Sequence, residues 1–351
     1  MHGIGTHSKT WVDDKDAEGD EKQSFAELFQ EKWDEYPQLK NKSFKLHSIC
    51  YDDEINKIFQ LWQDYAKQLK DQLKTSPLLA AQAAWFNDAV DEAVKAKGES
   101  NFGYTHLMDL LLFAGSPTLQ KRLVTYAGNQ VIKLIQQYAK DDDISILGHS
   151  MGCAMTHKVV QALYNEGVET QPGKFETIQG DFRFVNVTLV ANTSYSLSRD
   201  QKKFYLDRLV RPSSKAEDGC SYTWLNVNHQ YDPVGRFMPF DCHADPAWLD
   251  PVVATAGDYL DIVPKQLTSK SIHALTHYFR DPGFHIPYFK ALFGVKFSDK
   301  DIADAHAAFE NLTPEGKFKG LVSHLEQIDL SDTSSLKTLF VALKDFYALI
   351  K

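Results

Sequence analysis

Residues 144–155 read ISILGHSMGCAM, and this is the most informative part of the sequence. Its first four residues form a short apolar run typical of a buried strand, and helical spacing of apolar residues begins after Ser150. Between them, residues 148–152 fit the pattern G-x-S-x-G. A strand that turns sharply into a helix strains the backbone of the central serine, and its neighbours two positions away must lack bulk. The plainer alternative is that Gly148 and Gly152 only end a strand and start a helix.

Further strands and helices follow from hydrophobic periodicity. We predict strands at Ser43–Tyr51, Phe182–Ala191 and Tyr222–Val227, and helices at Phe25–Tyr36, Leu119–Tyr138 and Ser335–Ile350. Strands that alternate with helices favour a parallel sheet. A helix-rich stretch without strand signals, about residues 53–115, is an insertion for which two interpretations stay open, a cover over the active site and helices packed on the outside of the sheet.

A second motif, His2-Gly3-Ile4-Gly5, opens the chain. With this HGIG stretch and the GHSMG stretch in this order, the chain resembles the lipase and esterase branch of the α/β-hydrolase superfamily, over about half of its length. The resemblance implies an α/β-hydrolase fold, with a mostly parallel central sheet flanked by helices. It also implies an oxyanion hole made by the N–H groups of Ile4 and Met151, with His2 bracing the loop.

The chain departs from the family because no strand precedes His2. This leaves two alternatives: a loop that no strand holds, and a chain that lacks an upstream strand or targeting segment. We expect residues 1–297 to form the hydrolase domain, and residues 298–351 to form a C-terminal helical extension packed on it.

The resemblance also implies a catalytic acid and a histidine after Ser150, in that order. Asp232 follows the predicted strand at residues 222–227 and precedes Pro233 in a turn, which favours it over the competing acids Asp207, Asp241 and Asp245. Two histidines four residues apart, His273 and His277, are the candidate bases. We favour His273 because it stands at the entrance of a predicted helix, and His277 stays the alternative.

These residues predict acyl transfer through an acyl-enzyme on Ser150, with a small-molecule acyl substrate and neither a metal nor an organic cofactor. A thioesterase, amidase or serine peptidase would use the same residues, and an inactive hydrolase fold that serves as a scaffold is the alternative of another class. The net charge of −9 argues against nucleic-acid binding. Four cysteines without CxxC spacing, and the lack of a long apolar run, predict a cytoplasmic protein without a transmembrane segment.

Overall fold

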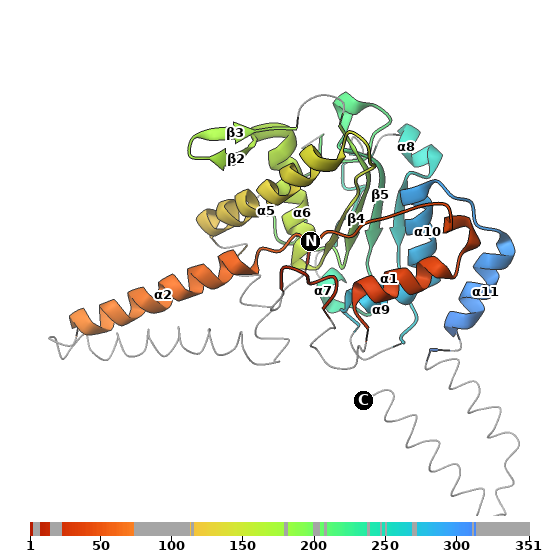
Figure 1. Ribbon diagram of the computed structural model, residues 1–351, viewed down its shortest axis with the longest axis horizontal. Helices are drawn as coiled ribbons and strands as arrows, with labels where there is room; N and C mark the ends of the chain where they lie inside the picture. Colours follow the sequence, from red (N-terminus) through yellow and green to blue (C-terminus); the bar gives the residue numbers. More distant parts are fainter. Residues whose placement is uncertain are drawn as a thin grey trace, which may run out of the picture.

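The fold is an α/β architecture built around one parallel sheet (Figure 1). A computed structural model describes residues 1–2, 8–14, 23–73, 113, 116–178, 182–198, 204–206, 209–236, 239–245, 248–249, 251–268, 272–310 and 312–313. The sheet has the strand order β1-β4-β5-β6, and each neighbouring pair is parallel. Its strands are β1 (Ile146–His149), β4 (Phe184–Val190), β5 (Ser221–Val227) and β6 (Tyr259–Ile262). The predicted class, a mostly parallel sheet flanked by helices, is confirmed.

Helices cover both faces of the sheet, and each face has its own hydrophobic core. On one side lie α5 (Pro117–Tyr138) and α6 (Met151–Gln161), and on the other lie α1 (Phe25–Asp34), α9 (Leu275–Arg280) and α10 (Pro282–Phe293) (Figure 1). Successive side chains of β4 point to opposite faces of the sheet, so Leu189 packs in the first core and Val190 packs in the second. Burial on both faces explains why five of the seven residues of β4 are apolar.

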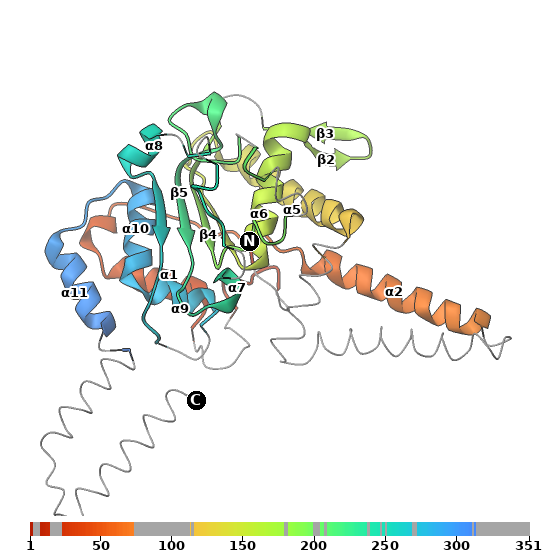
Figure 2. The ribbon, with the colours of Figure 1, turned by 180° about the vertical axis from the view of Figure 1, so that it is seen from behind.

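The remaining elements are peripheral to the sheet. Four are helices: α2 (Asp52–Leu73), α7 (Pro233–Arg236), α8 (Pro251–Ala256) and α11 (Asp299–Glu310). The strands β2 (Val168–Gln171) and β3 (Lys174–Glu176) form an antiparallel hairpin. The others are the short 3₁₀ helices η1 (Pro37–Leu39), η3 (Phe204–Leu206) and η4 (Ala216–Asp218), and the π-helical turn η2 (Ala162–Glu166). Seen from behind, α7 and α9 lie at the end of the sheet toward which the strand arrows of β4 and β5 point (Figure 2). The carboxyl ends of the strands therefore share one edge with these two helices.

Most predicted elements within the described residues are confirmed. The strands expected at 182–191 and 222–227 are β4 and β5, and the apolar run before the serine becomes β1. The helices expected at 25–36 and 119–138 are α1 and α5. The sequence interpretation missed β6 and the hairpin of β2 and β3. The predicted helix at 335–350 lies outside the described residues, and the division of the chain at residue 298 stays a prediction.

The predicted strand at Ser43–Tyr51 is wrong, because this segment has no regular secondary structure. Its backbone bonds to side chains where a strand would bond to a neighbour: the Gln130 side chain accepts from the Cys50 N–H and donates to the Cys50 carbonyl. A cavity of about 980 Å³ is lined on one side by residues 41–47 and Ile49, and on another by residues 144–147 at the start of β1. The side chains of residues 43–48 are alternately exposed and half-buried, as in a strand, but no strand among the described residues pairs with the segment.

The first two residues complete the edge of the sheet beside β1. The amine of Met1 donates to the Leu147 carbonyl, and the His149 N–H donates to the Met1 carbonyl at 3.2 Å. This is the spacing of bonds that a residue in a parallel neighbouring strand would make. His2 is thereby brought to the side of the sheet where β1 turns into α6.

The described part of the predicted insertion is α2, whose start is attached to the body of the molecule. Glu54 in its first turn accepts a hydrogen bond from Arg122 of α5 at 2.8 Å. The rest of the insertion up to Gly115, except Phe113, lies outside the described residues, so the choice between a cover and an outer packing layer stays open. None of the helices that the structure describes is long and apolar enough to span a membrane. All four cysteines are buried.

Candidate active site

Ser150 occupies the turn between β1 and α6 with a backbone conformation that L-residues rarely adopt. Its φ is 56° and its ψ is −127°, and Ser150 and Ala191 are the non-glycine residues with positive φ among those described. Two hydrogen bonds hold this turn: the Ser150 N–H donates to the Val190 carbonyl at 2.9 Å, and the Thr193 hydroxyl donates to the Ser150 carbonyl at 2.7 Å. Strain of this kind persists only where surrounding contacts enforce it.

The two glycines of the motif are required by close backbone packing. A Cβ at Gly148 would lie 2.7 Å from Oγ1 of Thr156 and 2.8 Å from the carbonyl oxygen of Gly152. A Cβ at Gly152 would overlap the carbonyl oxygen of His2 and lie 2.6 Å from that of Met1. The first glycine lets α6 turn back on β1, and the second lets the start of the chain pass directly over the helix. Both glycines therefore do more than end a strand and start a helix.

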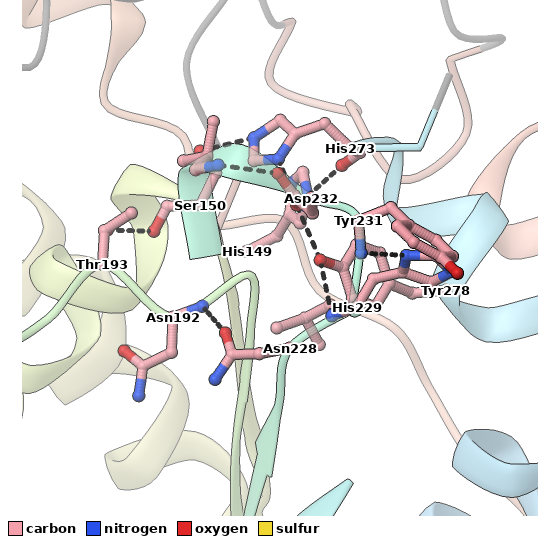
Figure 3. Close-up of polar contacts among 12 residues, drawn as sticks. His149, Ser150, Asn192, Thr193, Asn228, His229, Tyr231, Asp232, His273 and Tyr278 are labelled. Carbon is pink, nitrogen blue, oxygen red and sulfur yellow. Dashed lines mark hydrogen bonds and ion pairs between the residues drawn. The ribbon is translucent and has the colours of Figure 1, made fainter. Parts of the chain in front are cut away.

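The structure brings Ser150, His273 and Asp232 together in one hydrogen-bonded row (Figure 3). Oγ of Ser150 lies 2.8 Å from Nε2 of His273, and Nδ1 of the same ring lies 2.7 Å from Oδ2 of Asp232. Each residue follows the carboxyl end of a strand: Ser150 follows β1, Asp232 follows β5, and His273 follows β6. Since all strands of this sheet are parallel, their carboxyl ends lie at one edge of it.

Asp232 is fully buried, and several donors keep it ionised. Burial would raise the pKa of its carboxyl group, but hydrogen bonds from His273 and Tyr278, the charge interaction with His273, and the Val234 N–H lower the pKa to about 2. The Val234 N–H reaches Oδ1 at 2.9 Å, and the Tyr278 hydroxyl reaches Oδ2 at 2.6 Å. A carboxylate with this pKa carries its charge throughout the neutral range, where it can orient and stabilise a protonated imidazole.

His277, the alternative base, points away from the serine. Its Nδ1 lies 3.2 Å from the Thr268 hydroxyl, and its ring packs edge-on against His229 with 5.2 Å between centroids. Burial, followed by the charges of His229 and Arg280, lowers the pKa of His277 to about 4. The ring is held within the core at the start of α9, so His273 is the histidine that faces Ser150.

Of the two predicted oxyanion donors, Met151 lies within the described residues and Ile4 does not. Met151 is the first residue of α6 and is buried, so its N–H belongs to the helix amides that have no partner within the helix. Ile4, like the rest of residues 3–7, lies outside the described residues. His2, expected to brace this loop, is buried: its Nε2 accepts from the Tyr51 N–H at 3.2 Å, its ring stacks on that of Tyr51 at 4.0 Å, and its carbonyl accepts from the Tyr51 hydroxyl.

Two residues at the site were missed by sequence interpretation. Tyr278 donates to the acid, and the His149 ring contacts the main chain of the base, with Nε2 2.7 Å from the His273 carbonyl. His149 is the variable second position of the G-x-S-x-G pattern, so the motif assigns it no role. Tyr278 follows His273 by five residues, which places it one helical turn into α9, but no local signal relates it to Asp232.

The described residues contain no group of three or more His, Cys, Asp or Glu side chains arranged to hold a metal ion. The groups that the described residues bring to this edge of the sheet include a hydroxyl, an imidazole, a carboxylate and the amides at the start of α6. Comparison with known proteins adds no constraint on their role, since no family model, curated protein or solved structure matches this chain.

Proposed function

We propose that the protein is a serine hydrolase of the α/β-hydrolase type, which cleaves carboxylic esters through an acyl-enzyme on Ser150. The observation that carries this proposal is the continuous row from Ser150 Oγ through His273 to Asp232, at 2.8 and 2.7 Å. A serine that serves only structure has no need of a strained turn, an imidazole at its hydroxyl and a buried carboxylate behind that imidazole. Together these are the parts that activate a hydroxyl as a nucleophile.

The reaction follows from the positions of these atoms. Nε2 of His273 takes the hydroxyl proton while Oγ of Ser150 attacks the ester carbonyl, and Asp232 stabilises the imidazolium that forms. The oxyanion accepts from the Met151 N–H and, by the resemblance, from the Ile4 N–H. The imidazolium then gives its proton to the leaving alkoxide. Water, deprotonated by the same imidazole, attacks the acyl-enzyme and releases the acid with the serine restored.

Fluorophosphonate labelling tests the proposal directly, because this probe phosphonylates activated serines. We expect the wild type and Ser145→Ala to label and Ser150→Ala not to label. Ser145 precedes β1 at the opposite end of that strand, so it controls for the loss of any serine nearby. Ester turnover by Ser150→Ala should fall roughly a millionfold. Labelling of Ser150→Ala at the wild-type rate would refute the role of this serine.

Two further measurements refine the result. His273→Ala should abolish turnover and His277→Ala should retain it, because Nε2 of His273 contacts the serine hydroxyl whereas Nδ1 of His277 contacts the Thr268 hydroxyl. A panel of p-nitrophenyl esters of rising chain length separates an esterase from a lipase, and thioester and amide substrates test the related reactions. A wild type that neither labels nor turns over any of these substrates would favour the inactive scaffold.

A further inference from the structure

Tyr278 lies behind the proposed triad and is fully buried. Its hydroxyl oxygen is 2.6 Å from Oδ2 of Asp232 and 3.1 Å from the main-chain nitrogen of His229 (Figure 3). A backbone N–H can only donate, so the Tyr278 oxygen accepts from His229. The single hydroxyl hydrogen is then left for Asp232. The direction of both bonds is set by this chemistry.

The Tyr278 hydroxyl therefore forms hydrogen bonds with the residues at both ends of one turn. His229 and Asp232 are the first and last residues of a turn closed by a hydrogen bond of 3.2 Å from the Asp232 N–H to the His229 carbonyl. The His229 ring is fastened as well: its Nδ1 accepts from the Tyr231 N–H at 3.1 Å, and its Nε2 lies 3.2 Å from the Gln266 carbonyl. The turn that presents the acid is therefore tied to α9, the helix that follows the base.

Oδ2 of Asp232 is shared between two donors, Nδ1 of His273 and the hydroxyl of Tyr278. A buried carboxylate depends on such donors, since water cannot replace them. The groups that face it are His273 and Tyr278 through side-chain hydrogen bonds, the Val234 N–H through the backbone, and the more distant ring of His277. Tyr278 is the one uncharged side chain among them that donates to the carboxylate.

We propose that Tyr278 is a positioning residue for the hydrolase site, which orients Asp232 toward His273 and draws negative charge away from Oδ2. The proposal rests on the proposed function. Removal of the hydroxyl leaves the carboxylate with one donor fewer, so the Asp232–His273 pair holds its shared proton more tightly. The base is then available only at higher pH, and the acid side of the pH–rate profile moves upward.

Tyr278→Phe tests this with Tyr288→Phe as the matched control. Tyr288 is a buried tyrosine of α10 within the same core, away from the triad. For Tyr278→Phe, we expect kcat to fall roughly 10- to 100-fold, as when a buried charged group loses one hydrogen bond. KM should stay within about twofold because Tyr278 does not face the serine, and the acid limb should move to higher pH. Tyr288→Phe should match the wild type in all three.

A second variant guards against misfolding of the first. Replacing Tyr278 by 3,5-difluorotyrosine keeps the ring in place and makes the hydroxyl a stronger donor, so the acid limb should move to lower pH. An unchanged acid limb in both variants would overturn the positioning role while leaving fluorophosphonate labelling of Ser150 intact. Absence of labelling in the wild type would overturn the proposed function itself, which separates the two failures.

Discussion

Ser150 illustrates how a single residue can be held in an unfavourable conformation. Its positive φ costs roughly 1–3 kcal/mol for a residue with a side chain. The cost is offset by bonds to the Val190 carbonyl, at the end of β4, and from the Thr193 hydroxyl, in the segment that follows β4. The next strand in the sheet therefore holds the candidate nucleophile in place, and the hydroxyl meets His273 without any movement of the backbone.

Asp232→Asn tests the role of the acid at the same scale. An amide at this position cannot stabilise the imidazolium, and it would favour the wrong tautomer of His273, so kcat should fall roughly ten-thousandfold. Asp241→Asn is the control, because Asp241 is exposed and was a competing acid in the sequence. Steady-state kinetics at pH 7 measure both variants. Equal activity of Asp232→Asn and the wild type would remove Asp232 from the proposed mechanism.

Helix α1 begins at a cap formed by neighbouring residues, and it packs against a helix that is distant in the sequence. Ser24 caps it: the Ser24 hydroxyl accepts from the Glu27 N–H, and the Glu27 carboxylate accepts from the Ser24 N–H. The helix buries an aromatic face against α9, with the Phe29 and Phe279 rings stacked at 5.5 Å. Since α9 begins two residues after His273, α1 supports the helix that follows the base.

Loss of this cap should weaken the fold measurably. Ser24→Ala removes the hydroxyl acceptor and should lower the free energy of unfolding by about 1 kcal/mol. Ser8→Ala, in an exposed loop, should leave it unchanged. Urea denaturation followed by circular dichroism measures the difference. A Ser24→Ala curve that coincides with the wild type would show that packing alone defines the start of α1.

The elements that the sequence predicted correctly are those with strong local signals. β4 and β5 are seven residues each and are buried along most of their length, and α1 and α5 carry caps and helical spacing. β6 was missed because it is a four-residue strand with only one fully buried position. Residues 43–51 have the alternation of a strand, but pairing depends on a neighbour that local sequence does not reveal.

The site was predictable to the extent that it lies in motifs and turns. Ser150 and Asp232 stand in turns that follow predicted strands, and the entrance of a helix favoured His273 over His277. Tyr278 and His149 act through contacts between segments 46 and 124 residues apart, respectively. Such contacts follow from the three-dimensional packing, so neither residue could be identified from local pattern.

At the scale of the whole molecule, three buried histidines link stability to pH. Burial, the largest cause in each case, lowers the pKa of His157 to about 3, of His277 to about 4 and of His285 to about 3. In the unfolded chain a histidine titrates near 6.5. Between these values the unfolded chain binds protons that the folded protein does not. The free energy of unfolding therefore has its full contribution from these neutral histidines above about pH 6.5, and it decreases as the pH falls toward 4.

The expected size of this effect is about 2 kcal/mol per histidine between pH 7 and pH 5. His157→Phe should reduce the loss by about a third, because the His157 ring is stacked on Phe204 and neither of its ring nitrogens has a hydrogen-bond partner among the described residues. His243→Phe, at an exposed position, is the control. Urea unfolding at the two pH values measures the slopes. A wild-type slope in His157→Phe would show that this ring is protonated in the folded state.

The row of Ser150, His273 and Asp232 has a consequence for how the protein reaches its native state. Its members lie as far as 123 residues apart and reach one another only after β1, β5 and β6 have assembled in register. Parallel strands must close long loops before they gain any contact, so this assembly comes late relative to local helix formation. On the proposed function, a chain that has regained its helices before its sheet does not yet react with a fluorophosphonate. The fraction of molecules that react with this probe would then measure completed folding more strictly than a spectroscopic signal from the helices.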